Sequence, residues 1–380
     1  MKIAIPKESH PGELRVATTP DIIKKLISFG FDVIVETGAG DGASITDDDF
    51  KSAGATIAKD VDATFKSADV VLKIGAPSED ELNKIKKGAV VVAHLGILGN
   101  KKDANKYAKA GITTFAMELM PRISRAQSMD ILSSQSNLAG YKAVLDAAAE
   151  YGSAMPMMMT AAGTIAPAKV FIMGVGVAGL QAIATAKRLG AVVTATDVRP
   201  ATREQVESLG GKFLTVDEEM EREAETEGGY AKQMPPEYFE KQKQVVAEHI
   251  KKQDIVITTA LIPGREAPIL VTSEMVASMH AGAVIIDLAV EAGGNVEGVK
   301  LGKVVETKNG VKIVGHENVP SRLASDASKL FAKNLLNFLS PHVDEENKTI
   351  KFDWEDETVS GTCITRDGNI VHPMLIEKDA

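Results

Sequence analysis

The sequence is poor in cysteine and in aromatic residues. Its 380 residues include one cysteine, Cys363, so no disulfide can form within the chain, which fits a reducing compartment. Aromatic residues make up 4% of the chain, and the formal net charge is −9. Proteins that bind nucleic acids depend on basic surfaces and often on stacked aromatic rings. This composition therefore argues against a nucleic-acid partner.

Long hydrophobic runs are also scarce. The apolar stretch at the N-terminus is too short for the core of a signal peptide. The nearest approach to a membrane span is residues 170–186, but this segment contains three glycines and Gln181, with Lys169 and Lys187 beside it. A strand that turns into a buried helix explains it better than a membrane-spanning helix. The chain also lacks the HExxH and CxxC spacings of metal sites, so we expect no metal.

The sequence does contain two series of alternating strand and helix patterns. In the first third, short runs rich in Val and Ile predict strands at Lys2–Ile5, Asp32–Glu36, Val70–Ile74, Ala89–His94 and Ile112–Met117. Between them, amphipathic stretches predict helices, including Ser78–Lys87. A second series starts at Lys169. Continuous apolar strands that alternate with helices predict an α/β fold, with doubly wound parallel sheets covered on both faces. The chain length suits two such domains.

The region between the two series has its own patterns. Residues Gln127–Tyr151 predict one long helix, because apolar side chains recur at helical spacing. Two apolar arms then flank Ala162 and Gly163, which predicts a hairpin, and we expect the methionines at 155 and 157–159 to pack in a core or against another subunit. Near the C-terminus, Ser321–Leu339 predicts a strong amphipathic helix.

The clearest chemical signal is a glycine-rich turn. The strand predicted at Val170–Met173 runs directly into Gly174, Gly176 and Gly179, which have GxGxxG spacing, and a helix follows. In a dinucleotide-binding unit, the first glycine allows the tight turn, the second lets the backbone approach a pyrophosphate, and the third lets helix and strand pack closely. The N-terminus of the helix offers N–H donors and a positive dipole end to phosphates.

An acidic residue lies where such a unit needs one. Asp197 ends the next predicted strand, 18 residues after Gly179, where its carboxylate can accept hydrogen bonds from an adenosine ribose. Its charge would repel a 2′-phosphate, which favours NAD(H) over NADP(H), although Arg199 nearby makes that choice less clear. The alternative is a glycine turn in an α/β domain that binds no nucleotide.

Three further residues lie near the ends of early strands. Arg15 follows the first predicted strand, Lys73 lies near the end of the third, and His94 ends the fourth. Ligands bind at the carboxyl ends of parallel strands. Each of these residues therefore has either a role in a binding site or an ordinary structural or surface role.

Four segments carry a family resemblance: Met117–Tyr141, Phe171–Arg199, Thr258–Pro268 and Ile285–Asn295. They resemble the NAD(H)-binding component of proton-translocating nicotinamide nucleotide transhydrogenase. The resemblance implies two Rossmann-like domains, residues 1–134 completed by 320–380, and an NAD(H)-binding domain at 135–319. It also implies a homodimer that docks on an NADP(H)-binding component and a transmembrane component. The chain would then be cytoplasmic and peripheral on the inner face of the membrane.

The same resemblance implies roles for particular residues. Arg122, Gln127 and Asp130 would lie near the nicotinamide, and Tyr230 would lie in a mobile loop that closes over the nucleotide. The implied nucleotide-binding residues are Ser133, Gly174, Val175, Gly176, Val177, Ala178, Gly179, Asp197, Val198, Arg199, Gly229, Tyr230, Ala260 and Leu261. Hydride transfer between two nicotinamides needs no general acid, nucleophile or metal, so the protein must hold two rings face to face and exclude water.

Two other functions remain open. The related alanine dehydrogenases have substrate residues that match Arg15, Lys73 and His94, but their catalytic aspartate corresponds to Glu291 here. Under the transhydrogenase interpretation, the first three residues are inherited scaffold. The other alternative is a non-catalytic protein that senses NAD through a partner. An absence of hydride transfer in the presence of an NADP(H)-bearing partner would favour it.

Overall fold

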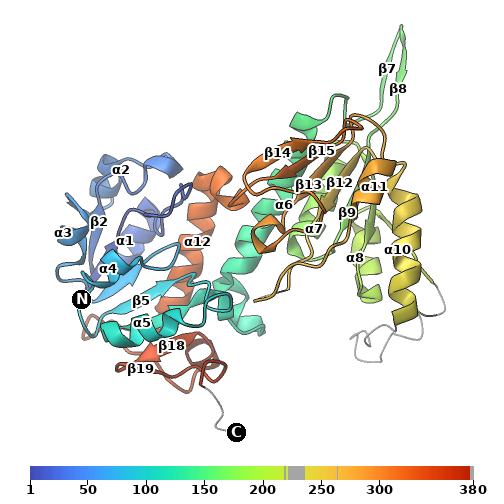
Figure 1. Ribbon diagram of the computed structural model, residues 1–380. Helices are drawn as coiled ribbons and strands as arrows, with labels where there is room; N and C mark the ends of the chain where they lie inside the picture. Colours follow the sequence, from blue (N-terminus) through green and yellow to red (C-terminus); the bar gives the residue numbers. More distant parts are fainter. Residues whose placement is uncertain (218–219, 221–235, 263, 377–380) are drawn as a thin grey trace. The chain divides into compact units, whose positions relative to one another are not determined.

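The computed structural model describes residues 1–217, 220, 236–262 and 264–376, which form two compact units (Figure 1). Unit 1 consists of Met1–Gln135 together with Pro320–Ala380, and unit 2 of Ser136–Val319. The chain leaves unit 1 inside helix α6 (Ile131–Glu150) and returns to it within a 3-10 helix, η6 (Val319–Leu323). Unit 2 is therefore continuous in sequence, whereas unit 1 is built from both ends of the chain.

Unit 1 contains an eight-stranded sheet with the order β19-β18-β6-β5-β4-β1-β2-β3. Strands β1 to β6 are parallel. From the C-terminal part of the chain, β18 pairs antiparallel with β6, and β19 pairs antiparallel with β18. Their bounds are β1 (Lys2–Ile5), β2 (Asp32–Glu36), β3 (Thr56–Ala58), β4 (Val70–Leu72), β5 (Val90–Ala93), β6 (Thr113–Ala116), β18 (Cys363–Arg366) and β19 (Asn369–Ile370). A separate small hairpin consists of β16 (Val343–Asp344) and β17 (Thr349–Ile350).

The helices of unit 1 follow local sequence signals. They are α1 (Pro20–Ser28), α2 (Asp47–Ser52), α3 (Val61–Phe65), α4 (Glu79–Leu82), α5 (Asp103–Ala110), α12 (Ala324–Leu339) and α13 (Glu357–Ser360). Thr46 and Ser78 form capping boxes at the starts of α2 and α4. Helix α5 ends at Gly111, whose φ of +67° suits glycine. A helix was predicted at Ser78–Lys87, but α4 is only one turn long. The capping box therefore predicted where the helix starts but not how long it is.

Unit 2 contains a seven-stranded sheet with the order β11-β10-β9-β12-β13-β15-β14, parallel except for β14. The strands are β9 (Lys169–Met173), β10 (Val192–Thr196), β11 (Lys212–Phe213), β12 (Ile255–Thr258), β13 (Val284–Asp287), β14 (Lys303–Glu306) and β15 (Lys312–Gly315). The helices are α7 (Val177–Arg188), α8 (Arg203–Ser208), α10 (Pro236–Ile250) and α11 (Ser273–Ser278). A hairpin of β7 (Met158–Thr160) and β8 (Gly163–Ile165) projects from this unit, as the sequence predicted (Figure 1).

Each sheet lies between two hydrophobic cores. In β1, Ile3 and Ile5 pack in one core of unit 1 and Ala4 packs in the other. In β9, Val170 and Ile172 contribute to one core of unit 2 and Phe171 to the other. Burial on both faces explains why these strands are continuous apolar runs and do not alternate with polar residues.

Both sheets share the same topology. When only the parallel strands from β1 to β6 and from β9 to β15 are numbered in chain order, each large sheet has the order 3-2-1-4-5-6, which is the doubly wound Rossmann arrangement. The predicted fold class is therefore confirmed. In this arrangement, ligands bind at the carboxyl ends of the strands, where the order reverses. That position lies between β1 and β4 in unit 1 and between β9 and β12 in unit 2.

The predicted helix Gln127–Tyr151 is interrupted. Residues Ser124–Met129 form a 3-10 helix, η3, and α6 starts only at Ile131. Asp130 lies between them and its carboxylate caps α6, which favours a new helix start at this position. In the described parts of the chain, no helix is both long and apolar enough to cross a membrane.

Candidate functional site

The glycine turn lies at the switch point of unit 2. Gly174 follows β9 with a φ of +102°, and a Cβ there would come 2.6 Å from Oγ1 of Thr259. A Cβ on Gly179 would come 1.9 Å from the carbonyl oxygen of Gly174, so only glycine lets α7 pack this closely on the turn. Among the described residues, a Cβ on Gly176 would meet no atom within 4 Å. Its outer side is open, which suits the approach of a ligand to the backbone.

The first turn of α7 presents backbone donors beside this opening. The first intrahelical bond runs from the Leu180 amide to the Gly176 carbonyl at 2.9 Å, so the amides of Val177, Ala178 and Gly179 have no acceptor within the helix. Helix α6 packs closely against this turn at Gly140, where a Cβ would come 2.0 Å from the Ala178 carbonyl oxygen. Free amides and a positive helix end can hold a phosphate group.

Asp197 follows the neighbouring strand β10 and stabilises the glycine turn by a hydrogen bond. Its Oδ2 accepts a hydrogen bond of 2.7 Å from the Val175 amide, and its Oδ1 accepts one of 2.8 Å from the Arg199 amide. Burial raises the pKa of the Asp197 carboxyl, but the hydrogen bonds from Arg199 and Val175 outweigh it and hold that pKa below its usual value. The charged form of Asp197 is therefore favoured at the end of β10.

The guanidinium of Arg199 forms a two-pronged ion pair with the same carboxylate. Its Nε lies 2.9 Å from Oδ1 and its Nη2 lies 3.0 Å from Oδ2 of Asp197. The Arg199 side chain is nevertheless 54% exposed, whereas the Asp197 side chain is 6% exposed. Val198 between them is exposed as well. The sequence predicted both charges at this site but did not indicate that each would already be paired with the other.

A second loop, after β12, completes the edge of the site. The amide of Ala260 donates to Oδ1 of Asn295 at 3.0 Å, and the Asn295 side chain donates to the Ala260 carbonyl at 2.9 Å. Asn295 is held in turn, because its own amide donates to the buried Asp287 at 2.7 Å. Leu261, the next residue, is exposed and can offer an apolar surface to a ring. Asn295 and Asp287 were missed as site residues, although both lie in one of the four segments that carried the resemblance.

Three further predicted residues, Arg122, Gln127 and Asp130, lie in the loop at residues 122–130 of unit 1. Arg122 precedes η3 and Gln127 lies on it, and both are exposed. Asp130 is half-buried and caps α6: its Oδ1 accepts from the Ser133 amide at 3.0 Å and its Oδ2 from the Ser133 hydroxyl at 2.5 Å. Asp130 therefore acts locally as a helix cap through Ser133, and each of its two oxygens accepts one hydrogen bond.

This loop is fixed from a distant part of the sequence. Arg125 forms a bidentate ion pair with Asp356, at 2.7 and 2.8 Å. The side-chain amides of Asn334 and Asn337 on α12 both donate to the Ser128 carbonyl, at 2.8 and 2.9 Å. The inward side chains of η3, Ala126 and Met129, pack in the core of unit 1. Arg122 and Gln127 are therefore presented on a firmly anchored segment.

The structure thus groups the predicted residues into two sets, each described within its own unit. The residues at the switch point of unit 2 are Gly174, Val175, Gly176, Val177, Ala178, Gly179, Asp197, Val198, Arg199, Ala260 and Leu261. Arg122, Gln127 and Asp130 lie on the anchored loop of unit 1, and Ser133 follows on α6. Gly229 and Tyr230 lie outside the described residues.

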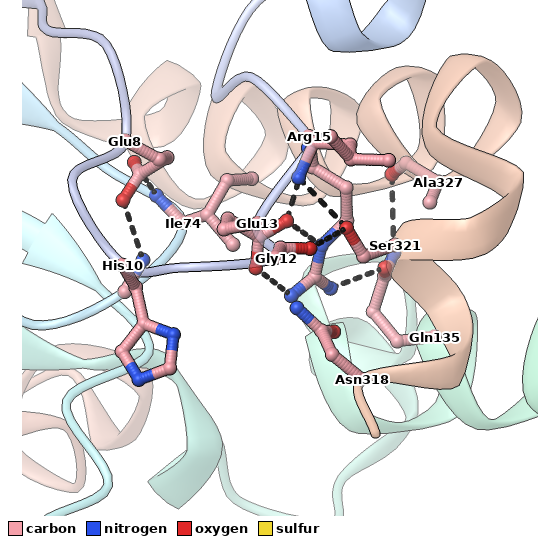
Figure 2. Close-up of polar contacts among 12 residues, drawn as sticks. Glu8, His10, Gly12, Glu13, Arg15, Ile74, Gln135, Asn318, Ser321 and Ala327 are labelled. Atoms are coloured by element: carbon pink, nitrogen blue, oxygen red, sulfur yellow. Dashed lines mark hydrogen bonds and ion pairs between the residues drawn. The ribbon is translucent and has the colours of Figure 1, made fainter. Parts of the chain in front are cut away.

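The charged residues at the switch point of unit 1 are engaged with each other. Lys73 is fully buried, and its Nζ lies 2.8 Å from Glu81 and 3.3 Å from Glu8. Figure 2 shows the Arg15 guanidinium between Glu13, at 2.6 and 2.8 Å, and Gln135, at 2.8 Å. His94 is exposed after β5. Arg15 and Lys73 thus have carboxylate partners supplied by the chain itself.

Fold and site together define a Rossmann-type protein of two units, with a dinucleotide-type turn in the second. The family described as alanine dehydrogenase/PNT matches with its N-terminal domain over residues 4–139 and with its C-terminal domain over residues 143–373. The chain belongs to this family, and within it to the group of NAD(P) transhydrogenase alpha subunits.

Individual relatives support that placement. The chain is 64% identical to an NAD(P) transhydrogenase alpha subunit of Rhodospirillum rubrum over the full length of both chains. It is similar to the crystal structure of a transhydrogenase from Sinorhizobium meliloti, with a TM-score of 0.86 and 53% identity over 98% of this chain and all of the other. An alanine dehydrogenase of Mycolicibacterium smegmatis is 33% identical over 77% of this chain and 74% of its own length.

Proposed function

We propose that unit 2 binds NAD(H) and that the chain exchanges hydride between this nucleotide and NADP(H) held on a partner subunit. The observation that carries the proposal is the turn at Gly174–Gly179, whose open side at Gly176 adjoins the donors at the start of α7. The amides of Val177, Ala178 and Gly179 would hold the pyrophosphate. Val198 and Leu261, exposed on either side of the switch point, would cover apolar ring faces.

Asp197 would select the nucleotide. Its carboxylate is charged and almost buried, so a 2′-phosphate placed against it would meet a like charge in a poorly solvated site. A ribose with free hydroxyls would instead donate to it. We therefore expect NADH to bind this chain more tightly than NADPH, and the difference to narrow in Asp197→Asn.

The anchored loop would position the reacting ring. When bound, NAD(H) supplies the hydride chemistry itself, and the protein must fix the ring's orientation and keep water out. Gln127 can both donate to and accept from a carboxamide, and Arg122 can donate. Asp130, as the cap of α6, would hold the end of the loop. None of these residues is required to transfer a proton.

The partners follow from the same proposal. We infer a homodimer, an NADP(H)-binding component, and a transmembrane component that couples hydride transfer to proton translocation and holds the chain peripherally at the cytoplasmic face. The hairpin β7–β8 supports self-association, because Met158 and Met159 are exposed on it, Met159 to 77%, and Met157 is exposed directly before it. Apolar side chains on a projecting hairpin suit burial against a second copy.

Reconstitution tests the function directly. The purified chain is mixed with the NADP(H)-binding component of a transhydrogenase, and reduction of an NAD analogue by NADPH is followed in a single turnover. We expect transfer only when both proteins are present. The same purified chain, given NADH, pyruvate and ammonia, should oxidise no NADH. A robust pyruvate-dependent rate would instead make the chain an alanine dehydrogenase, and no transfer in either assay would leave an NAD-sensing protein.

A further inference from the structure

The carboxylate of Asp197 has no acceptor position to spare. Oδ1 accepts from the Arg199 amide and from Arg199 Nε, and Oδ2 accepts from the Val175 amide and from Arg199 Nη2. Four hydrogen bonds on two oxygens use the acceptor capacity of a carboxylate. A ribose hydroxyl that approaches Asp197 therefore finds its place taken.

The four bonds divide into two kinds. The two from backbone amides fix the turn after β9 and the loop after β10, and they are independent of the side chain at position 199. The two from the guanidinium go one to each oxygen. If the guanidinium leaves, each oxygen regains one acceptor position, which matches the two O–H donors of a ribose 2′,3′-diol.

We propose that Arg199 is an internal competitor of the adenosine ribose: its guanidinium occupies the two acceptor positions on Asp197 that the ribose hydroxyls need, and it leaves them when NAD(H) binds. The inference rests on the proposed function, because it assumes that the ribose is recognised by Asp197. It makes Arg199 a residue that sets affinity and specificity without being required for binding.

The geometry makes this exchange feasible. The Arg199 side chain is 54% exposed, so its charge can be rehydrated when it swings away. Its guanidinium is also held by the Val175 carbonyl, but that oxygen lies 3.3 Å from Nη2, which is a long hydrogen bond. Asp197 by contrast is buried and needs its acceptors filled. Two ribose hydroxyls satisfy that need, whereas a 2′-phosphate brings no donor in place of the 2′-hydroxyl.

Removing Arg199 should change the affinity for NADH in the direction opposite to the one that its charge alone predicts. Removing a positive charge beside a bound dianion should weaken binding by simple electrostatics. If Arg199 competes for Asp197, its removal should instead tighten binding. We expect Arg199→Ala to bind NADH about fivefold more tightly at pH 8. This gain in affinity is what is expected when the nucleotide no longer has to break one half-exposed ion pair. Arg199→Gln removes the charge but retains an uncharged NH2 donor group, so its NADH affinity should lie between those of the parent and Arg199→Ala.

The control variant is Arg188→Ala. Arg188 is exposed at the far end of α7, about 16 Å along the helix from its first residue, so this change removes the same charge without touching Asp197. A slight weakening is expected there. ADP and 2′-deoxy-ADP serve as second probes in calorimetry: the gain in Arg199→Ala should be full for ADP and smaller for 2′-deoxy-ADP, which offers one hydroxyl fewer.

The outcomes separate this inference from the proposed function. If the parent binds NADH and both Arg199 variants bind it equally or more weakly, the competitor role is wrong while NAD(H) binding stands. A gain of equal size for ADP and 2′-deoxy-ADP also overturns it, because Asp197 would then not receive the 2′-hydroxyl. If the parent binds no NADH at all, the proposed function itself fails. Thermal unfolding of each variant confirms that the compared proteins are folded.

Discussion

The two units of this protein have the same sheet topology but differ at the switch point, which is an open glycine turn in unit 2 and a cluster of paired charges in unit 1. In unit 2 the first strand turns through Gly174–Gly179 directly into α7, and the outer side of Gly176 is open. In unit 1 the first strand, β1, is followed by a polar loop, and α1 begins only at Pro20. Within that loop Glu8 reaches the fully buried Lys73, which follows β4.

The strand order therefore fixes where a site can form, and the loop after the first parallel strand determines whether that position can bind a ligand. An open glycine turn leaves backbone donors available to a ligand. A lysine clamped between Glu8 and Glu81 fills the equivalent place with charges that satisfy each other. Fold alone does not imply a nucleotide site, and here one chain contains both outcomes on one topology.

The largest expected effect comes from breaking the charged cluster of unit 1. Lys73→Met leaves Glu8 and Glu81 buried without their cation, and we expect a loss of about 3–5 kcal/mol in the free energy of unfolding. The affinity of the folded variant for NADH should not change, because the site in unit 2 is untouched. Denaturant unfolding and NADH titration measure the two quantities.

The matched control is Lys51→Met. Lys51 pairs with Asp48 at 3.0 Å, but both side chains are more than half exposed, so the expected loss in the free energy of unfolding is small compared with that of Lys73→Met. If Lys73→Met abolished NADH binding while leaving the protein as stable as the control, unit 1 would contain the nucleotide site and the comparison would be reversed.

A second prediction concerns the anchored loop. Gln127→Asn shortens the side chain by one methylene and keeps its hydrogen-bonding groups, so it displaces the contact without removing it. We expect single-turnover hydride transfer in the reconstituted complex to fall by about a hundredfold, with little change in NADH affinity. Gln244→Asn on the exposed face of α10 is the control and should transfer at the parent rate. A parent-like rate in Gln127→Asn would remove the loop from the site.

The glycine turn of unit 2 can be tested with two alanines. Gly179→Ala places a Cβ 1.9 Å from the Gly174 carbonyl oxygen, so α7 must shift, and we expect a loss of about 1–3 kcal/mol in stability together with weaker NADH binding. The new Cβ of Gly176→Ala meets no atom within 4 Å in the part of the chain that the structure describes. It should leave stability unchanged but obstruct the pyrophosphate and weaken NADH binding. Equal NADH affinity in Gly176→Ala and the parent would contradict a phosphate site at this turn.

The smallest expected effect is a pH dependence. The hydrogen bonds from Arg199 and Val175 hold the pKa of Asp197 in the folded protein below that of an ordinary aspartate. Its contribution to stability is therefore complete at neutral pH and is lost as the pH falls below the unfolded pKa and through the lower, folded one. Asp197→Asn removes this contribution. The variant should be less stable than the parent at neutral pH by about 1 kcal/mol, and the gap should close in strong acid. A gap that is constant with pH would mean that the ion pair with Arg199 does not stabilise the fold.

Much of unit 2 was predictable because its signals are local. Strand, glycine turn and helix follow one another within about twenty residues, and burial on both faces makes each strand a continuous apolar run. The break at Asp130 was not predicted, because the helical spacing of apolar residues continues across it. The contacts that hold the loop could not be predicted either, because they join residues far apart in the sequence. Asn334 contacts Ser128 across 206 residues, and Asp356 contacts Arg125 across 231. Nothing in the local pattern ties such positions together.

The interrupted layout of unit 1 has a consequence for synthesis. Strand β18 pairs with β6, so Cys363 lies beside Phe115, and Phe331 and Leu335 of α12 belong to the core that contains Ile3 and Ile5. When residue 319 leaves the ribosome, unit 2 has its whole sequence, but unit 1 still lacks a core helix and two strands of its sheet. Domains in most chains complete their folding from the N-terminus onward. In this protein unit 2 is the first unit that can complete its fold, and the N-terminal segment of unit 1 can do so only after the C-terminal residues have been synthesised.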